Sequence, residues 1–136
     1  MRLLLPTNVL VAAFVARGVC SELLEHCVRH HVVISSRPLL DELSDVLTRK
    51  FHQRAVEARG AMRLLGEMFT LVVPDVPERA VCRDRDDDVV MATALAGECA
   101  AIVTGDQDLL ALDPFHGIRV LAPTAFWKWE SEYDSP

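Results

Sequence analysis

Long apolar runs are missing from this 136-residue sequence, although 51% of its residues are hydrophobic. A membrane-spanning helix needs roughly 18 to 20 uninterrupted apolar residues, and no stretch of the chain approaches that length. The first residues also lack the apolar region and the small-residue cleavage site that are typical of a secretory signal. We therefore expect a cytoplasmic protein that has no membrane partner.

Paired cysteines are missing as well. None of the four cysteines has C-x-x-C spacing, and they lie in otherwise apolar or loop stretches, at Cys20, Cys27, Cys82 and Cys99. Disulfide frameworks and zinc knuckles depend on regularly spaced cysteines in a suitable compartment. The pattern therefore favours reduced thiols, in agreement with a cytoplasmic location.

Glycine and proline are scarce, with 6 and 7 residues, and no stretch is rich enough in them to form a linker. The sequence also contains no internal repeat. A chain of this length and hydrophobic content has the usual size of a single domain with a packed core. We expect one domain over residues 1–129, followed by an acidic tail over residues 130–136.

Positive charge is in deficit, because the formal net charge is -6, which by itself argues against a nucleic-acid partner. The deficit is confined to one half of the sequence. Residues 1–63 contain nine Lys and Arg against six Asp and Glu, whereas residues 64–136 contain five against fourteen. The net charge therefore conceals two differently charged regions and does not exclude a nucleic-acid substrate.

Short apolar segments alternate with segments whose apolar residues have helical spacing. The expected strands are residues 3–5, 31–35, 70–74, 100–104 and 118–121. The expected helices are residues 9–15, 21–30, 36–47, 51–69, 86–96, 106–112 and 123–129, the first of them capped by Thr7 or Asn8. Connections of this length suit parallel pairing, and continuous apolar strands are typical of a sheet that is covered on both faces. The pattern predicts an α/β fold, a single-domain three-layer sandwich with a mainly parallel central sheet.

Acidic residues gather where the predicted strands end. The sequence TGDQD, residues 104–108, follows the fourth strand, and the sequence DRDDD, residues 84–88, opens the helix before it. Glu42 is the acidic residue nearest to the apolar stripe of its helix. Because ligands of open α/β sheets bind outside the carboxyl ends of the strands, we expect these carboxylates to converge.

Converging carboxylates repel one another unless they are protonated, solvated or bridged by a cation. Hard oxygen ligands of this kind suit Mg²⁺ or Mn²⁺. Such an ion activates a bound water and stabilises the oxygens of a phosphodiester during in-line displacement. The acids therefore indicate a metal-dependent nuclease.

Four stretches of sequence together resemble the PIN-domain proteins, specifically the small bacterial group described as VapC-like toxins of toxin–antitoxin systems. These stretches are LLLPTNVLVAAF, SRPLLDELSDVL, RDRDDDVVMATALAGECAAIVTGDQDLLAL and GIRVLAPTAF, and the resemblance extends over residues 2–126. It implies a PIN-like fold and a ribonuclease that uses Mg²⁺ or Mn²⁺ to cleave single-stranded RNA. It also implies a cognate antitoxin protein as partner and a homodimer or higher homo-oligomer.

The same resemblance assigns site residues one at a time. It puts the catalytic and metal-binding acids at Glu42, Asp106 and Asp88, the last with Asp84 and Asp87 as neighbours. It makes Asp108 a further metal ligand. The residues that support the ligands are Thr7, Asn8 and Thr104. Thr104 is expected to hydrogen-bond to a metal-bound water or to a carboxylate.

The first strand departs from the family pattern. The family's D-T-N motif has an aspartate where this chain has Pro6, followed by Thr7 and Asn8. Proline offers no side-chain oxygen to a cation and no backbone N–H. We therefore expect a vacant ligand position at Pro6 and a ribonuclease that is weakened or inactive. The alternative is a non-catalytic PIN module that binds RNA or a protein through the same site.

A basic patch and two tryptophans each have two interpretations. The patch formed by Arg49, Lys50 and Arg54 would hold an RNA backbone, or it is an ordinary helix end whose cations favour the helix dipole. Trp127 and Trp129 would stack on RNA bases, although packing in the core or between subunits is the favoured reading.

Two other site types fit the sequence less well. His26 and His30 have the i, i+4 spacing of a metal-binding pair, but no third ligand lies nearby in the sequence, which favours a surface helix face. A phosphate-accepting receiver domain also clusters acids at strand ends. It needs a lysine at a later strand end, and the chain has only Lys50 and Lys128.

Overall fold

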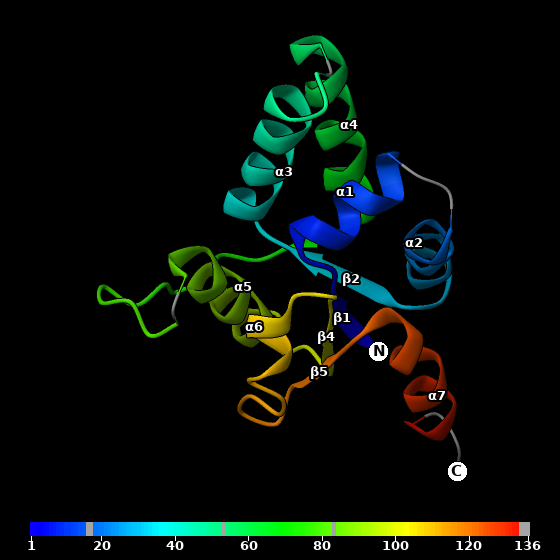
Figure 1. Cartoon of the computed structure of the whole chain (residues 1–136), viewed down its shortest axis with the longest axis vertical. Helices are drawn as coiled ribbons and strands as arrows, with labels where there is room; N and C mark the ends of the chain where they lie inside the picture. Colours follow the sequence, from blue (N-terminus) through cyan, green and yellow to red (C-terminus); the bar gives the residue numbers. More distant parts are fainter. Residues whose placement is uncertain (16–17, 53, 83, 134–136) are drawn as a thin grey trace.

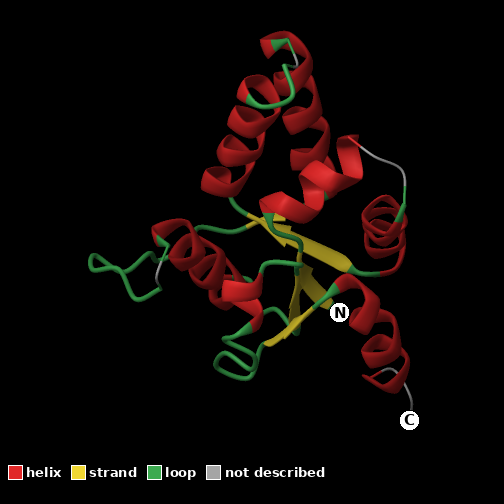
Figure 2. Cartoon of the chain, in the orientation of Figure 1, coloured by secondary structure: helices red, strands yellow, loops and turns green. Residues whose placement is uncertain are grey.

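The computed structural model describes residues 1–15, 18–52, 54–82 and 84–133, which form a sandwich around a five-stranded parallel sheet. The strands lie in the order β3-β2-β1-β4-β5. Their bounds are β1 Arg2–Leu4, β2 Val32–Ser35, β3 Thr70–Leu71, β4 Ala101–Val103 and β5 Arg119–Leu121. Figure 2 shows the helices on both sides of this sheet. The predicted α/β class with a parallel central sheet is therefore confirmed.

Seven helices flank the sheet within the described residues. They are α1 Thr7–Val15, α2 Val19–His30, α3 Arg37–Arg49, α4 Ala55–Met68, α5 Arg85–Ala96, α6 Gln107–Leu110 and α7 Pro123–Tyr133. No single one of them is long and apolar enough to cross a membrane, and only α1 and α2 pass that test as a pair, bent by 110°.

The two faces of the sheet bury separate hydrophobic clusters, because side chains alternate along each strand. In β1, Leu3 belongs to the cluster that α1, α2, α4 and α7 cover, whereas Leu4 belongs to the cluster that α5 and α6 cover. Helix α3 contributes leucines to both clusters. Trp127 and Trp129 pack against the first cluster, which confirms the packing interpretation of these two side chains. The four cysteines are free thiols, as predicted.

Helix α1 begins earlier than predicted. The carbonyl oxygen of Pro6 accepts hydrogen bonds from the backbone N–H groups of Val9 and Leu10, so Pro6 stands at the cap position. The prediction that Thr7 or Asn8 caps this helix is therefore wrong. Both residues lie inside the first turn, where their side chains are available to other elements.

Aspartates cap the two helices that follow the acidic stretches. The Asp84 carboxylate accepts a hydrogen bond from the backbone N–H of Asp86 at the start of α5. The Asp106 carboxylate accepts one from the backbone N–H of Asp108 at the start of α6. Capping satisfies backbone donors that lack a partner within the helix, and it sets where each helix begins.

Helix α7 continues into the segment that was predicted to be a tail. It extends to Tyr133, and Glu130 contacts both His26 and His31. The predicted boundary after residue 129 therefore moves, because residues 130–133 belong to the helix. Residues 134–136 of the predicted tail lie outside the described residues.

Candidate functional site

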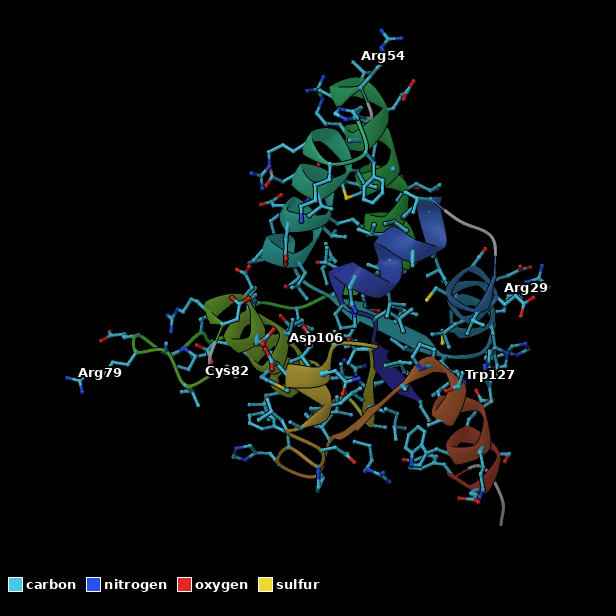
Figure 3. All side chains as sticks on the ribbon, viewed as in Figure 1. Arg29, Arg54, Arg79, Cys82, Asp106 and Trp127 are labelled. Atoms are coloured by element: carbon cyan, nitrogen blue, oxygen red, sulfur yellow. The ribbon has the colours of Figure 1, made fainter. Side chains whose placement is uncertain are left out.

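An acidic cleft of about 120 Å³ lies where β1 and β4 end and where α5 and α6 begin. Its lining residues are Pro6, Thr7, Asn8, Glu42, Asp84, Asp86, Asp87, Val90, Asp106 and Leu109. Figure 3 labels Asp106 near the middle of the molecule, between α5 and α1. Half of these described lining residues are acidic and none is basic, so the cleft concentrates negative charge.

Glu42 reaches the acidic cleft from α3, whose buried leucines hold the helix against the sheet. The hydroxyl of Thr7 donates a hydrogen bond to its carboxylate, with 3.1 Å between Oγ1 and Oε2. Burial raises the pKa of Glu42, and the carboxylates of Asp86 and Asp84 raise it further. These effects outweigh the hydrogen bond from Thr7, which lowers the pKa, so the pKa of Glu42 is raised. The structure therefore brings the predicted Glu42 into the cleft and gives Thr7 a supporting contact.

Among the acidic residues of the cleft, Asp87 has the most strongly shifted pKa. Its side chain is largely buried, and burial together with the carboxylates of Asp106 and Asp84 raises its pKa to about 6. Burial and the neighbouring negative charges both disfavour the ionised form of this carboxyl group. A bound cation would relieve this repulsion and favour the ionised form.

Asp88, the predicted metal ligand on α5, faces away from the acidic cleft. Its carboxylate accepts hydrogen bonds from the backbone N–H groups of Val81 at 3.1 Å and Cys82 at 2.7 Å, and Nη1 of Arg85 lies 3.4 Å away. Burial would raise the pKa of Asp88, but these hydrogen bonds outweigh it and lower the pKa. In this structure Asp88 anchors the loop before α5 and does not line the acidic cleft, so that metal binding by Asp88 stays a prediction.

The rotation of helix α5 explains why Asp87 takes the place expected for Asp88. Successive residues of an α-helix are rotated by about 100°, so neighbours point in different directions. Asp84, Asp87 and Val90 recur every three residues and line the cleft, whereas Asp88 and Met91 line a separate, largely apolar pocket. This three-residue spacing is the sequence signal that could have identified Asp87 as the residue facing the cleft.

Asp106 reaches the acidic cleft from the turn after β4. The buried hydroxyl of Thr104 accepts a hydrogen bond from the backbone N–H of Asp106 at 3.1 Å and donates one to Oδ1 of Asn8 at 3.3 Å. These bonds link the end of β4 to the start of α1 beside the carboxylates. Asp108, predicted as a further ligand, is exposed and does not line the cleft.

Pro6 lines the acidic cleft at the end of β1. Its carbonyl oxygen is engaged by the first turn of α1, and its ring carries no oxygen or nitrogen that binds a cation. The expected vacant position is therefore adjacent to the acids. A carboxylate at this position would add a ligand from a further segment of the chain.

The predicted basic patch does not stay together in the structure. Arg49 and Lys50 line a hollow of about 590 Å³, which shares Glu42 with the acidic cleft. Arg54 precedes α4, and Figure 3 shows it at the end of the molecule far from Asp106. Only the first two residues of the patch are near the cleft.

Comparisons with known proteins agree with the architecture. A family model described as PIN domain matches residues 2–108. The crystal structure of VapBC2 from Rickettsia felis bound to a DNA fragment from their promoter contains a similar chain, with a TM-score of 0.60 and 14% sequence identity. The match covers 88% of this chain and 97% of that chain. At this identity the likeness concerns the fold. No curated protein matches the sequence significantly.

Proposed function

The chain belongs to the PIN-domain family, and from that premise we propose that it is a metal-dependent endoribonuclease whose site is the acidic cleft. We also propose that it is the toxin of a VapC-like toxin–antitoxin pair in the cytoplasm. Its proposed partners are an RNA substrate, a cognate antitoxin protein and further copies of the chain in a homodimer or higher homo-oligomer. The likeness to VapBC2 supports this proposal at the level of the fold.

The observation that carries the proposal is the convergence of Glu42, Asp87 and Asp106 in one cleft. The three carboxylates come from separate segments, and burial together with the carboxylate of Asp106 contributes to the raised pKa of Asp87. An oxygen-only set of ligands fits Mg²⁺ or Mn²⁺. When bound, such an ion supplies an activated water and stabilises charge on the oxygens of the phosphodiester.

The remaining residues of the cleft orient the acids in the proposed mechanism. Thr7 holds one oxygen of Glu42 through its 3.1 Å hydrogen bond. Thr104 and Asn8 hold the turn that carries Asp106. Fixed ligand orientations matter because residues that support metal ligands strongly affect metal affinity.

The RNA backbone is proposed to cross the hollow beside the cleft. Arg49 and Lys50 supply the positive charge there, among four acidic lining residues that include Glu42. Arg49 forms an ion pair with Asp45, whereas the described residues include no acidic partner of Lys50. Lys50 is therefore the cation most available to an RNA phosphate.

Pro6 is the reason to propose weak or absent cleavage for this chain. A site with fewer carboxylates holds Mg²⁺ or Mn²⁺ less tightly and with altered geometry. The same observation favours the second candidate function, in which the degenerate PIN domain binds RNA or a protein without cleaving. Both candidates use the acidic cleft, and turnover distinguishes them.

An RNA-cleavage assay of the chain beside Pro6→Asp, with Mn²⁺ and with EDTA, tests the proposal. We expect Pro6→Asp to cleave at least about 10-fold faster than the chain itself, because it restores a metal ligand. EDTA and the matched variant Pro6→Asp/Asp106→Asn should abolish that activity. Equal cleavage by the chain and Pro6→Asp would contradict the role given to position 6, and RNA binding by Pro6→Asp without cleavage would favour the binding module.

A further inference from the structure

Two histidines and a glutamate converge at the edge of the sheet opposite the acidic cleft. His26 comes from α2, His31 directly precedes β2, and Glu130 comes from α7. The acidic cleft lies where the parallel strands end, whereas His31 lies where β2 begins. Figure 1 shows α2 and α7 beside each other and away from α5 and α6, and the two helices are in contact. The two clusters are therefore separate sites.

We propose that His26, His31 and Glu130 form a zinc-binding site that ties α7 to α2. The Nε2 atoms of His26 and His31 lie 2.6 Å and 2.5 Å from the same atom, Oε2 of Glu130. All three ligand atoms lie within 4.8 Å of one another. Ligand atoms about 2.0–2.1 Å from a tetrahedral zinc ion are about 3.3 Å apart. To admit the ion, Oε2 must therefore move away from the two nitrogens, and the widest pair of ligand atoms must approach by up to about 1.5 Å.

The chemistry of these three side chains selects the kind of ion. Imidazole nitrogen suits zinc and other late transition metals, whereas Mg²⁺ prefers oxygen ligands throughout. Two imidazoles and one carboxylate form a known zinc ligand set that leaves the fourth position to water. The acidic cleft has only oxygen ligands, so the two sites differ in the metal that each favours.

Packing holds the ligands in place. The His31 side chain is 6% exposed, and its Nδ1 accepts a hydrogen bond from the terminal ammonium of Met1 at 3.1 Å. The His26 ring meets the Trp127 ring edge-on, with 4.7 Å between the centroids. The Glu130 side chain is 15% exposed. Restrained ligands bind a metal better, because little further ordering is needed.

The charge at this site also favours a cation. Burial would raise the pKa of Glu130, but the hydrogen bonds with His31 and His26 outweigh it and lower the pKa, which keeps the carboxylate ionised. Across the described ranges, the two histidines are the ion-pair partners of Glu130, and no lysine or arginine pairs with it. A zinc ion would therefore meet a negative ligand that no lysine or arginine side chain of the described residues already neutralises.

His30 provides a matched control because it neighbours the site without joining it. In the sequence, His30 has the i, i+4 spacing from His26 that is typical of a metal-binding pair, although a surface helix face is the favoured interpretation. In the structure His26 instead converges with His31, and the exposed His30 ring lies against the His26 ring at 4.8 Å between centroids. The third ligand, Glu130, is distant in sequence and comes close only through the docking of α7.

The direct test is a zinc titration of the full chain, untagged and freed of metal with EDTA. It is done in an Asp87→Asn/Asp106→Asn background, which weakens the acidic cleft as a competing site. Competition with a chromophoric chelator measures the bound zinc, and visible absorption of Co²⁺ in its place reports the coordination. We expect about one zinc per chain, lost in H31Q and in Glu130→Gln and kept in His30→Gln.

Thermal unfolding gives a second readout. Zinc at 100 times its Kd should raise the Tm by about 5–10 °C for the chain and for His30→Gln, but not for Glu130→Gln. If H31Q does not fold, His26→Gln replaces it, because the His26 side chain is 27% exposed and tolerates change more easily. Absence of zinc binding by the chain, or zinc that persists in the ligand variants, overturns the proposal. Neither readout requires RNA cleavage, so this result is independent of the proposed function.

Discussion

Asp87 and Asp88 are adjacent on α5, and their carboxylates have opposite surroundings. Asp87 lines the acidic cleft with other carboxylates, whereas Asp88 accepts hydrogen bonds from the backbone N–H groups of Val81 and Cys82. Burial and neighbouring negative charge raise the pKa of Asp87 to about 6, and hydrogen bonds lower the pKa of Asp88. Asp87 therefore adds negative charge to the acidic cleft, and its neighbour Asp88 stabilises a loop.

Asparagine substitutions separate these two roles. Asp88→Asn removes the charged acceptor of two backbone N–H groups and should lower the midpoint of urea unfolding by roughly 1 M. Asp87→Asn removes repulsion within the cleft and should leave the midpoint at pH 7 unchanged or raise it. Both midpoints are measured by tryptophan fluorescence without metal. Equal destabilisation by the two substitutions would contradict the assignment.

The raised pKa of Asp87 predicts how stability depends on pH. Its value increases from 3.8 to about 6 on folding, so the folded protein holds this proton more tightly than the unfolded chain. The contribution of Asp87 to stability therefore falls as the pH rises from about 4 through the folded pKa to about 7, and it is constant above that range. The difference in Tm between the chain and Asp87→Asn, measured without metal, should decline by about 3–5 °C over this range. A Tm difference that does not change with pH would contradict the raised pKa of Asp87.

The hydrogen bond from Thr7 to Glu42 should support metal binding. Thr7→Val keeps the size of the side chain but removes the donor, whereas Thr7→Ser retains it. We expect Thr7→Val to weaken Mn²⁺ binding roughly 10-fold and Thr7→Ser to have a much smaller effect. Isothermal titration of each variant in the Pro6→Asp background measures this. Similar losses in both variants would show that the hydroxyl is not responsible.

Gly97 provides a test of packing at the end of α5. A Cβ atom at Gly97 would lie 2.4 Å from Cγ2 of Ile34, a fully buried side chain of β2. Gly97→Ala should therefore destabilise the fold by about 1–3 kcal/mol. Gly60 on α4 is the matched control, because a Cβ atom there meets no heavy atom within 4 Å. Gly60→Ala should be neutral or stabilising by up to about 1 kcal/mol in urea unfolding.

The charge in the hollow beside the acidic cleft leads to a prediction about RNA binding. Lys50→Ala removes a positive charge next to Glu42 and should weaken the binding of a single-stranded RNA a few-fold, with a smaller salt dependence. Arg54→Ala removes the same charge at the far end of the molecule and should leave binding nearly unchanged. Fluorescence anisotropy in EDTA measures binding without cleavage. Equal effects of the two substitutions would argue against this path for the RNA.

The order of strands and helices was predictable because it follows from local patterns. Apolar strands and amphipathic helices have different periods, and these depend on residues that are close in sequence. The ends of the elements were less predictable. The third strand was predicted over residues 70–74, but β3 covers only Thr70–Leu71, at the edge of the sheet where it pairs with β2 alone.

The sequence by itself determined the α/β class, the acids that follow the strands and the absence of a ligand at Pro6. These depend on residue type and local spacing, and no folded contact changes the fact that proline lacks a side-chain oxygen. The tertiary structure decided that Asp87 faces the cleft and that Glu130 joins His26 and His31. Each helical residue turns the side chain by about 100°, so a shift of one position changes what a side chain faces. Contacts between α2 and α7 arise only when the helices pack on the sheet, because no local pattern relates residues so distant in sequence.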